Sequence, residues 1–508
     1  MIYAGIDCGT QGAKVVLWDA QQTKIIASSY FTYDLISTRF GQKEQDPALW
    51  LAAIKDGFNT VLTQARISSN VIAGLGVSGQ QHGLVLLDKN HQVLRPAKLW
   101  CDTEAVDDLH CFLSDFERRH HKTVSACIGI NIPVAFTIAK LLWVKNHEPT
   151  IFSAIHKICL PHEYINLWLT GNYCAESGDA SGTGYFDTFN RCWSQEVADF
   201  IDADLFKKLP PLIQSHEPAG YLTDNAAQEL GLPAGIPVSS GGGDNMMSAI
   251  GTGNITPGLL TMSLGTSGTL FTHTHHQVDS RKQTDINSFC SSSNGWLPLI
   301  STMNVTSAVN SFRHILDVPI ENFEEYLGQS LPGSGGLYCF PCFNGSRFPD
   351  IPHMKASLHG MTSSNFTKSN LLRCVIEGVT YKICKGIDEF RRQGLVFSQI
   401  RVIGGAAKSA TWCQMIADIS GLDVIRPTVT EAAAFGAALQ AQWCKENSES
   451  HDRYIPVSEI LPSFLFNSEG NIFTPAKNQQ MLYQKLYHKY HQNLYYYLQN
   501  NKPDSFME

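Results

Sequence analysis

Two short stretches of the sequence place charged and hydroxyl side chains on glycine turns that follow apolar runs. In IYAGIDCGTQGAK, Asp7 ends an apolar run, and LLTMSLGTSGTLF repeats the shape at Gly265–Gly268 without an aspartate. Glycine turns expose backbone N–H groups and let phosphate oxygens approach the chain closely. Two such turns facing each other would therefore hold a polyphosphate from both sides, with Thr10 and Thr266 as hydroxyl donors and Lys14 as a cation.

Asp7 lies directly beside the first turn, where a carboxylate alone would repel phosphate groups. A cation removes this repulsion, and Mg²⁺ is typically bound through one or two carboxylates together with substrate phosphates and waters. The alternative is an aspartate that only closes a hairpin turn, and the repetition of the hairpin favours the metal. The sequence thus predicts Asp7 as a ligand, direct or through water, of the Mg²⁺ that accompanies a bound nucleotide.

A third glycine-rich stretch, SSGGGDNMMSAIG, places Asp244 between three glycines and a helix-like segment. A carboxylate on such a turn can accept the proton of an alcohol during phosphoryl transfer. The same position also suits an aspartate that caps the first N–H groups of a helix. We interpret Asp244 as the general base and expect it, together with Asn245, to contact the alcohol.

Polar side chains also lie between two apolar runs in GVSGQQHGLVLL, which contains Gln80, Gln81 and His82. A cluster of three hydrogen-bonding side chains suits a pocket for sugar hydroxyls, whereas a lone histidine there would more often be structural. Asp102, in WCDTEA, is expected to orient a substrate hydroxyl or, alternatively, to cap a helix.

The elements that must position these residues repeat in two halves. Each half has a glycine-turn hairpin, strand-like runs and helix-like segments, which predicts a mixed α/β sheet with helices on both faces. Clefts between duplicated domains commonly hold small molecules, so we expect residues 1–250 and 251–508 to form two similar domains around a central cleft. The main helices are expected at 46–65, 370–394, 429–444 and 480–499, with further strands at 71–79 and 399–403 and a hairpin at 84–100.

Composition excludes several classes of protein. The 508-residue chain is 43% hydrophobic and 17% charged, as in globular proteins, and its net charge of −8 is not gathered in a basic block. We therefore expect no nucleic-acid partner and, without an apolar stretch of about 20 residues, no membrane span. The 14 cysteines are scattered through apolar segments, which indicates buried free thiols and the cytoplasm. We interpret the C-x-x-C pair Cys339 and Cys342 as structural.

Several common catalytic motifs are missing from the sequence. It has no G-x-x-x-x-G-K-[ST], and no G-x-G-x-x-G follows the first strand. H-E-x-x-H and G-x-S-x-G are likewise missing in a fitting context. These observations argue against P-loop nucleotidases, dinucleotide-dependent enzymes, zinc hydrolases and serine hydrolases.

The remaining pattern resembles the two-domain carbohydrate kinases related to glycerol kinase. The motifs that carry this resemblance span most of the chain: GIDCGTQGAK, KEQDPALW, SGQQHG, SDASGT, GGGDN, SLGTSG, IGGAAKS and TEAAAFGAA. The resemblance implies two ribonuclease H-like ATPase domains of the kind found in actin, hexokinase and the Hsp70 chaperones. Within the family, EQDPALW, GQQHGLVLLD and LRPAKLWCDTEA are similar to the subgroup that phosphorylates D-xylulose.

The resemblance also implies roles for individual residues. Asp244 would be the base toward the C5 hydroxyl of D-xylulose, Gln81 and His82 would contact the sugar, and Asp7 would support Mg-ATP. The nucleotide would be held at its phosphates and at its adenosine end by Thr10, Gln11, Lys14, Gly265, Thr266, Gly405, Ser409 and, near the nucleotide, Asn310.

Two function classes remain open at this point. The first is an ATP-dependent ketose kinase, with ribulose, glycerol or gluconate as alternative substrates. The second is a non-enzymatic actin-like protein switched by ATP, which needs the hairpins and Asp7 but neither a base nor a sugar pocket. The presence of both GGGDN and SGQQHG favours the enzyme. The expected partners are ATP and a sugar, and a homodimer stays open.

Overall fold

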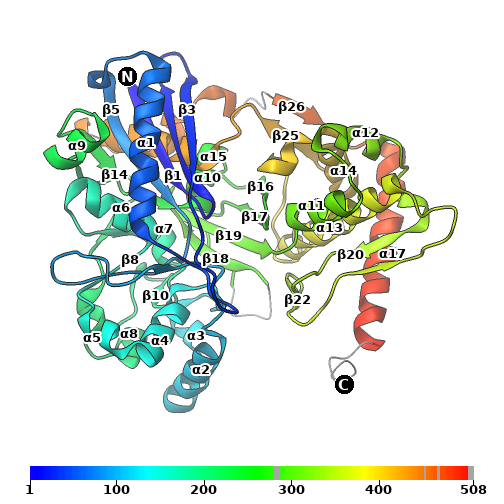
Figure 1. Cartoon of the computed structure of the whole chain (residues 1–508), viewed down its shortest axis with the longest axis horizontal. Coiled ribbons are helices and arrows are strands. Elements are labelled where there is room, and N and C mark those ends of the chain that lie inside the picture. The colour runs from blue at the N-terminus through cyan, green and yellow to red at the C-terminus, as the bar shows by residue number, and fades with distance from the viewer. Residues whose placement is uncertain (280–284, 451–452, 466–469, 501–508) are drawn as a thin grey trace.

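The protein was analysed as a computed structural model, which describes residues 1–279, 285–450, 453–465 and 470–500. Two mixed β-sheets form the centres of two halves, which lie side by side in Figure 1. Each half is built on the glycine-turn hairpin that the sequence predicts. The fold class expected from the sequence is confirmed.

The first sheet is built around β1 (Ile2–Cys8) and has the order β13-β14-β5-β1-β2-β3, with β15 also paired to β5. β1 pairs antiparallel with β2 and parallel with β5, so the carboxyl ends of β1 and β5 meet at one edge. Asp7 lies at that edge. The other strands are β2 (Gly12–Asp19), β3 (Lys24–Thr32), β5 (Ile72–Gly79), β13 (Pro218–Tyr221), β14 (Pro237–Ser239) and β15 (Gly242–Gly243).

The second sheet repeats this topology and has the order β18-β19-β17-β16-β24-β25-β26. β16 (Leu259–Leu264) corresponds to β1, because it pairs antiparallel with the next strand along the chain and parallel with β24. The turn Gly265–Gly268 therefore lies at the equivalent edge. The other strands are β17 (Gly268–Thr272), β18 (Asn287–Ser291), β19 (Gly295–Thr302), β24 (Gln399–Ile403), β25 (Asp423–Pro427) and β26 (Gly470–Phe473).

Both faces of the first sheet are covered, which explains why β1 is apolar from Ile2 to Ile6. Side chains alternate between faces along a strand. Ile2, Ala4 and Ile6 lie in the core that also contains Trp50 of α1 (Pro47–Ala65), whereas Tyr3 lies in the core that contains Ala434 and Phe435 of α15. The cap at Asp46, whose side chain accepts a hydrogen bond from the N–H of Ala48, fixes the start of α1.

Helix α15 (Ala432–Glu449) belongs to the second half by sequence but packs against β1 and β5 of the first sheet. Its alanines and Gly436 allow backbone contact with α10 (Asp244–Gly251). A Cβ on Gly436 would collide with the backbone of Met247, and a Cβ on Gly251 with the backbone of Ala432. The expectation that this small-residue helix packs closely on a neighbour is confirmed.

Further helices cover the remaining surfaces. The predicted helix at 370–394 is α13 (Lys368–Arg392), and the C-terminal helix is α17 (Lys477–Asn500), which packs on α13 and on α14 (Ala410–Ser420). The remaining α-helices are α2 (Val106–His120), α3 (Val124–Ile128), α4 (Thr137–His147), α5 (Pro149–Ala154), α6 (Pro161–Thr170), α7 (Ser177–Ala180), α8 (Gln195–Ile201), α9 (Asp224–Leu230), α11 (Thr306–Ile315), α12 (Phe323–Gly328) and α16 (Val457–Ile460).

The hairpin expected at 84–100 forms through the antiparallel bridges Leu84–Lys98 and Leu87–Val93. Its strands are short and also pair with distant segments: β6 (Val85–Leu87) pairs with β8 (Lys157–Cys159), and β7 (Ala97–Lys98) pairs with β4 (Glu44–Gln45). The sequence did not predict these distant partners. All 14 cysteines are free, including Cys339 and Cys342, as expected.

Candidate active site

The two glycine turns meet between the two halves. The side-chain amide of Gln11 lies 3.5 Å from the hydroxyl of Thr266, across the space between the hairpins. The second turn is held by α11, because the N–H groups of Val305 and Thr306 donate to the carbonyls of Thr266 and Gly265. The two turns thus lie within side-chain contact of each other.

The hydroxyl of Thr10 is part of a hydrogen-bonded chain rather than a free donor. It accepts a hydrogen bond from the indole N–H of Trp100 at 2.9 Å and donates to Oε1 of Gln80 at 3.0 Å. Gln80 in turn donates to Gln45, and Gln45 donates to the backbone carbonyl of Thr10. Gln80 therefore supports the turn. It does not line the pocket that lies beside Asp244.

Asp7 lies between two strands whose register brings Lys14 and Ser78 beside it. Ser78 donates a hydrogen bond to Oδ1 of Asp7 at 2.9 Å, which leaves Oδ2 available to a cation. Burial raises the pKa of the Asp7 carboxyl, while Ser78 and Lys14 lower it and Glu431 raises it. An oxygen ligand of this kind fits Mg²⁺, because a bound cation would offset the desolvation of the carboxylate.

Lys14 forms an ion pair with Glu431, the residue that immediately precedes α15. The pair joins the first sheet to the second half and neutralises the cation that was expected to contact phosphate. Sequence reasoning missed Glu431 as a partner, although it lies in the motif TEAAAFGAA.

Asp244 is the first residue of α10 and lies next to the Gly242–Gly243 strand that pairs with β5. Its Oδ1 accepts hydrogen bonds from the backbone N–H and the side-chain amide of Asn245, at 2.8 and 2.9 Å. Burial first, and then the negative charges of Asp7 and Asp179, raise the pKa of Asp244 to about 7. A carboxyl with this pKa is suited to accept a proton at neutral pH.

A pocket of about 120 Å³ lies beside Asp244 and takes its walls from both halves. Asn245 bridges these halves, since its Nδ2 donates to Oε1 of Gln81 at 2.7 Å and its Oδ1 accepts from Thr269 at 2.7 Å. The lining residues are Gln81, His82, Trp100, Pro133, Ala135, Phe136, Asp244, Asn245, Ser267, Gly268, Thr269, Asn287, Phe289, Leu299, Ser301, Thr302 and Arg347.

His82 forms an uncharged wall of this pocket. Its ring lies between Phe136, at a centroid distance of 4.8 Å, and Phe289, at 5.9 Å. Burial, together with the charge of Lys140, lowers the pKa of His82 to about 3. The imidazole is therefore neutral at physiological pH and can only offer a directional hydrogen bond to a ligand.

Asp102, like Gln80, was predicted for the sugar pocket but is absent from its lining. Its side chain is buried, and Oδ2 accepts from the backbone N–H of Lys43 at 2.8 Å and from Nζ of Lys98 at 3.1 Å. Nζ of Lys98 also forms ion pairs with Glu44 and Glu104. Lys98 already occupies the centre of this acidic cluster, so Asp102 supports the structure behind Trp100 instead of facing a hydroxyl.

The residues predicted for the adenosine end lie beside the second turn. A Cβ on Gly404 would lie 2.6 Å from the carbonyl oxygen of Leu264, so the Gly404–Gly405 turn approaches the end of β16 closely. Ser409 caps α14 by accepting a hydrogen bond from the N–H of Trp412 at 3.1 Å. Asn310 is exposed on α11, the helix that holds the Gly265–Thr266 turn.

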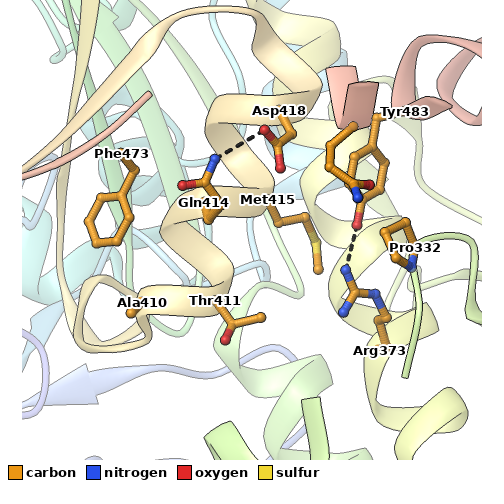
Figure 2. Close-up of a pocket in the computed structure, with 10 residues that line it drawn as sticks. Pro332, Arg373, Ala410, Thr411, Gln414, Met415, Asp418, Phe473 and Tyr483 are labelled. Atoms are coloured by element: carbon orange, nitrogen blue, oxygen red, sulfur yellow. Dashed lines mark hydrogen bonds between the residues drawn. The ribbon is translucent and has the colours of Figure 1, made fainter. Parts of the chain in front are cut away.

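A larger cavity of about 450 Å³ lies between α13, α14, α17 and β26, outside this site (Figure 2). Four of its polar side chains are paired with one another: Arg373 donates to the hydroxyl of Tyr483 at 2.7 Å, and Gln414 donates to Asp418 at 3.0 Å. Neither glycine turn contributes to its lining. We assign no ligand to this cavity.

Sequence reasoning missed several residues that line the pocket. Trp100 and Phe136 lie in apolar segments that read as core, and Arg347 lies in a loop without helical or strand periodicity. A lone arginine beside an aromatic residue in GSRFP was the available signal for Arg347. Thr269 follows the second glycine turn directly, so the hairpin motif could have predicted it as a site residue.

Two sheets of similar topology, two glycine turns that meet between them and a carboxyl of raised pKa beside a polar pocket suit a phosphotransferase that acts on a small alcohol. Two family models match the chain: the FGGY family of carbohydrate kinases, N-terminal domain, over residues 2–251, and the C-terminal domain of the same family over residues 260–444. The chain belongs to the FGGY family of carbohydrate kinases, and ATP is the substrate that such a kinase uses.

Individual relatives extend over nearly the whole chain. The xylulose kinase of Haemophilus influenzae is 41% identical over 495 residues, which covers 96% of this chain and 98% of that protein. The xylulose kinase of Bacillus subtilis is 32% identical, and the match covers 93% of this chain and 97% of that protein. A crystal structure described as a xyloylose kinase from Brucella ovis superposes with a TM-score of 0.87 at 29% identity, covering 98% of this chain and all of that one.

No helix within the described ranges is long and apolar enough to cross a membrane.

Proposed function

We propose that the protein transfers the γ-phosphoryl group of ATP to D-xylulose and forms D-xylulose 5-phosphate. The observation that carries this proposal is the position of Asp244, which borders both the sugar-sized pocket and the region where the glycine turns meet. Xylulose kinases that match the chain nearly end to end support the choice of sugar.

In this mechanism Asp244 accepts the proton of the C5 hydroxyl while that oxygen forms its bond to the γ-phosphorus. The bond from phosphorus to the β–γ bridging oxygen breaks, and ADP leaves with the electron pair. The raised pKa of about 7 matches the base to neutral pH. Asn245 keeps the carboxylate oriented through its two hydrogen bonds to Oδ1.

The sugar is held by Gln81, His82 and Asn245. The amide of Gln81 is fixed by Asn245, and the neutral ring of His82 is fixed by two phenylalanines. Polar groups that are already fixed orient a ligand at low entropic cost. Asp102 acts behind this wall through Lys98.

The nucleotide phosphates are bound by the turns that contain Thr10, Gln11, Gly265 and Thr266. Lys14 would contact them only when the phosphates displace Glu431 from their ion pair. The adenosine lies toward Gly405 and Ser409, with Asn310 on the neighbouring helix. Asp7 would hold Mg²⁺ through its second carboxylate oxygen, and that ion would neutralise developing phosphate charge. The turn donors then position the γ-phosphate in line with the hydroxyl.

The finer organisation follows the same proposal. Residues 1–250 carry the base and one wall of the sugar pocket, and residues 251–508 carry the opposite wall and most of the nucleotide site. Free thiols throughout the chain agree with the reducing cytoplasm as its location. An assembly of two copies stays a prediction, which sedimentation equilibrium tests.

A coupled ADP-release assay with Mg-ATP tests the function. The sugars are D-xylulose, L- and D-ribulose, glycerol and gluconate, with a sugar-free control. Strong stimulation by D-xylulose alone is the expected result. Greater stimulation by another sugar would keep the kinase mechanism and refute the substrate, and ADP release that does not depend on any sugar would refute both.

A further inference from the structure

Arg347 is a half-buried guanidinium in the wall of the candidate sugar pocket. It lies over the ring of Trp100, at 5.3 Å from the ring centre. In the part of the chain that the structure describes, no hydrogen bond or ion pair joins this guanidinium to another residue. Because a desolvated cation gains from an oxygen acceptor, its surroundings leave a place for a ligand.

The backbone holds Arg347 firmly in this position. Arg347 lies in the short hairpin of β21 (Ser346–Arg347) and β22 (Asp350–Ile351). The preceding Gly345 has φ 78° and contacts the backbone of Pro352 so closely that no Cβ fits there. Its carbonyl accepts a hydrogen bond from Nδ2 of Asn304 at 2.9 Å. A side chain without a partner on a backbone fixed in this way indicates a binding role rather than a mobile surface residue.

Arg347 lines the pocket opposite residues of the first half, among them Trp100 and His82. Its positive charge acts on His82 and on Lys140 and lowers the pKa of both groups. Lys140 is not available to a ligand, because its ammonium donates to the carbonyls of residues 134, 135 and 136. Arg347 is the cation in the pocket lining.

We propose that Arg347 donates two hydrogen bonds to the C2 carbonyl oxygen and the C1 hydroxyl of a bound ketose, and so selects a ketose over the corresponding polyol. This inference rests on the proposed function, in which the C5 hydroxyl faces Asp244. The planar fork of a guanidinium matches two oxygens that lie near one plane, as a carbonyl and its neighbouring hydroxyl can. Reduction of C2 removes both the planarity and the strong carbonyl acceptor.

The test compares kcat/KM for D-xylulose and for xylitol, which has a hydroxyl at C2, at saturating Mg-ATP. For R347A we expect a loss of roughly 10- to 100-fold with D-xylulose, mainly through KM, because hydrogen bonds to charged groups are strong. The loss with xylitol should stay below about threefold. R347K, which keeps the charge but not the fork, should fall between wild type and R347A with D-xylulose.

R118A is the matched control, because Arg118 is exposed on α2 and, among the residues that the structure describes, pairs only with Asp115. It should leave kcat/KM unchanged for both substrates. Equal losses for the two substrates in R347A and R347K would overturn the inference, since Arg347 would then only shape the pocket. If R347A does not fold, judged by its melting temperature, R347K alone decides by the same criterion. Wild-type turnover of D-xylulose tests the proposed function separately; if another ketose is preferred, that sugar and its polyol replace the pair. A preferred substrate without a ketone refutes both proposals.

Discussion

Replacement of Asp244 by asparagine is the sharpest test of the mechanism, because it removes the proton acceptor and keeps the shape. The amide oxygen of Asn can still accept the hydrogen bonds that Asp244 receives from the backbone N–H and the side chain of Asn245. Substrate binding should therefore change little. Turnover should fall by about 10²–10⁴-fold, the usual contribution of a positioned general base.

The pH dependence of turnover is a second test of Asp244 as the base. With a pKa of about 7, half of the Asp244 carboxyls are ionised at pH 7, so kcat/KM should decline about tenfold per unit below pH 6. A cation bound at Asp7 favours the ionised form of the neighbouring carboxylate and lowers its pKa. The acidic limb of kcat should therefore lie at lower pH than that of kcat/KM.

Initial rates of ADP release between pH 5 and 9 measure both profiles for wild type and D244N. The residual activity of D244N should lack the acidic limb, and its affinity for ATP should match that of wild type. D244N should also melt at a higher temperature than wild type at pH 8. Because the pKa of Asp244 is raised in the folded state, its ionisation lowers the stability of the wild-type fold as pH rises from about 4 toward 7. A variant within tenfold of wild type, or one that keeps the limb, would refute Asp244 as the base.

Three further predictions follow from the same geometry. Asp7→Asn should shift the Mg²⁺ titration of activity to higher concentration by at least about tenfold, and an unchanged titration would exclude Asp7 from the metal site. Asn245→Ala should raise KM for the sugar roughly tenfold, since it breaks a bridge of two hydrogen bonds; an unchanged KM in steady-state kinetics would contradict this role. Gly436→Ala should lower the melting temperature strongly, because its Cβ meets the backbone of Met247, whereas Gly328→Ala, with open space around it, should not; equal melting temperatures would refute the backbone contact.

The sequence predicted the duplicated hairpins because their signal is local. An apolar run, a glycine turn and a second apolar run are complete within about a dozen residues, and turn chemistry depends on near neighbours. The same holds for the helix that begins after Asp46 and for the small-residue helix α15. Asp244 could be found because three glycines before a helix leave few structural explanations for a carboxylate.

Residues whose role depends on distant neighbours could not be predicted in this way. Glu431 becomes significant only when α15 returns to the first sheet and meets Lys14. Asp102 looks like a pocket residue in the sequence, yet Lys98 draws its carboxylate into a buried cluster. Arg347 comes from the second half and reaches a pocket whose motifs lie in the first. Each case is set by tertiary packing, which no local pattern encodes.

The walls of the pocket imply that the two halves move during turnover. The pocket of about 120 Å³ takes its walls from both halves, so separation of the halves would admit the sugar. The halves are joined at the pocket by side-chain contacts, Asn245 to Thr269 and Gln11 to Thr266, which can separate. By contrast, α10 and α15 are joined backbone to backbone, where separation would open a void. Opening should therefore pivot at the α10–α15 contact and release the hydrogen bond between Asn245 and Thr269. Closure would then restore it and reorient Asp244 only when a sugar fills the pocket, which couples substrate binding to the assembly of the base.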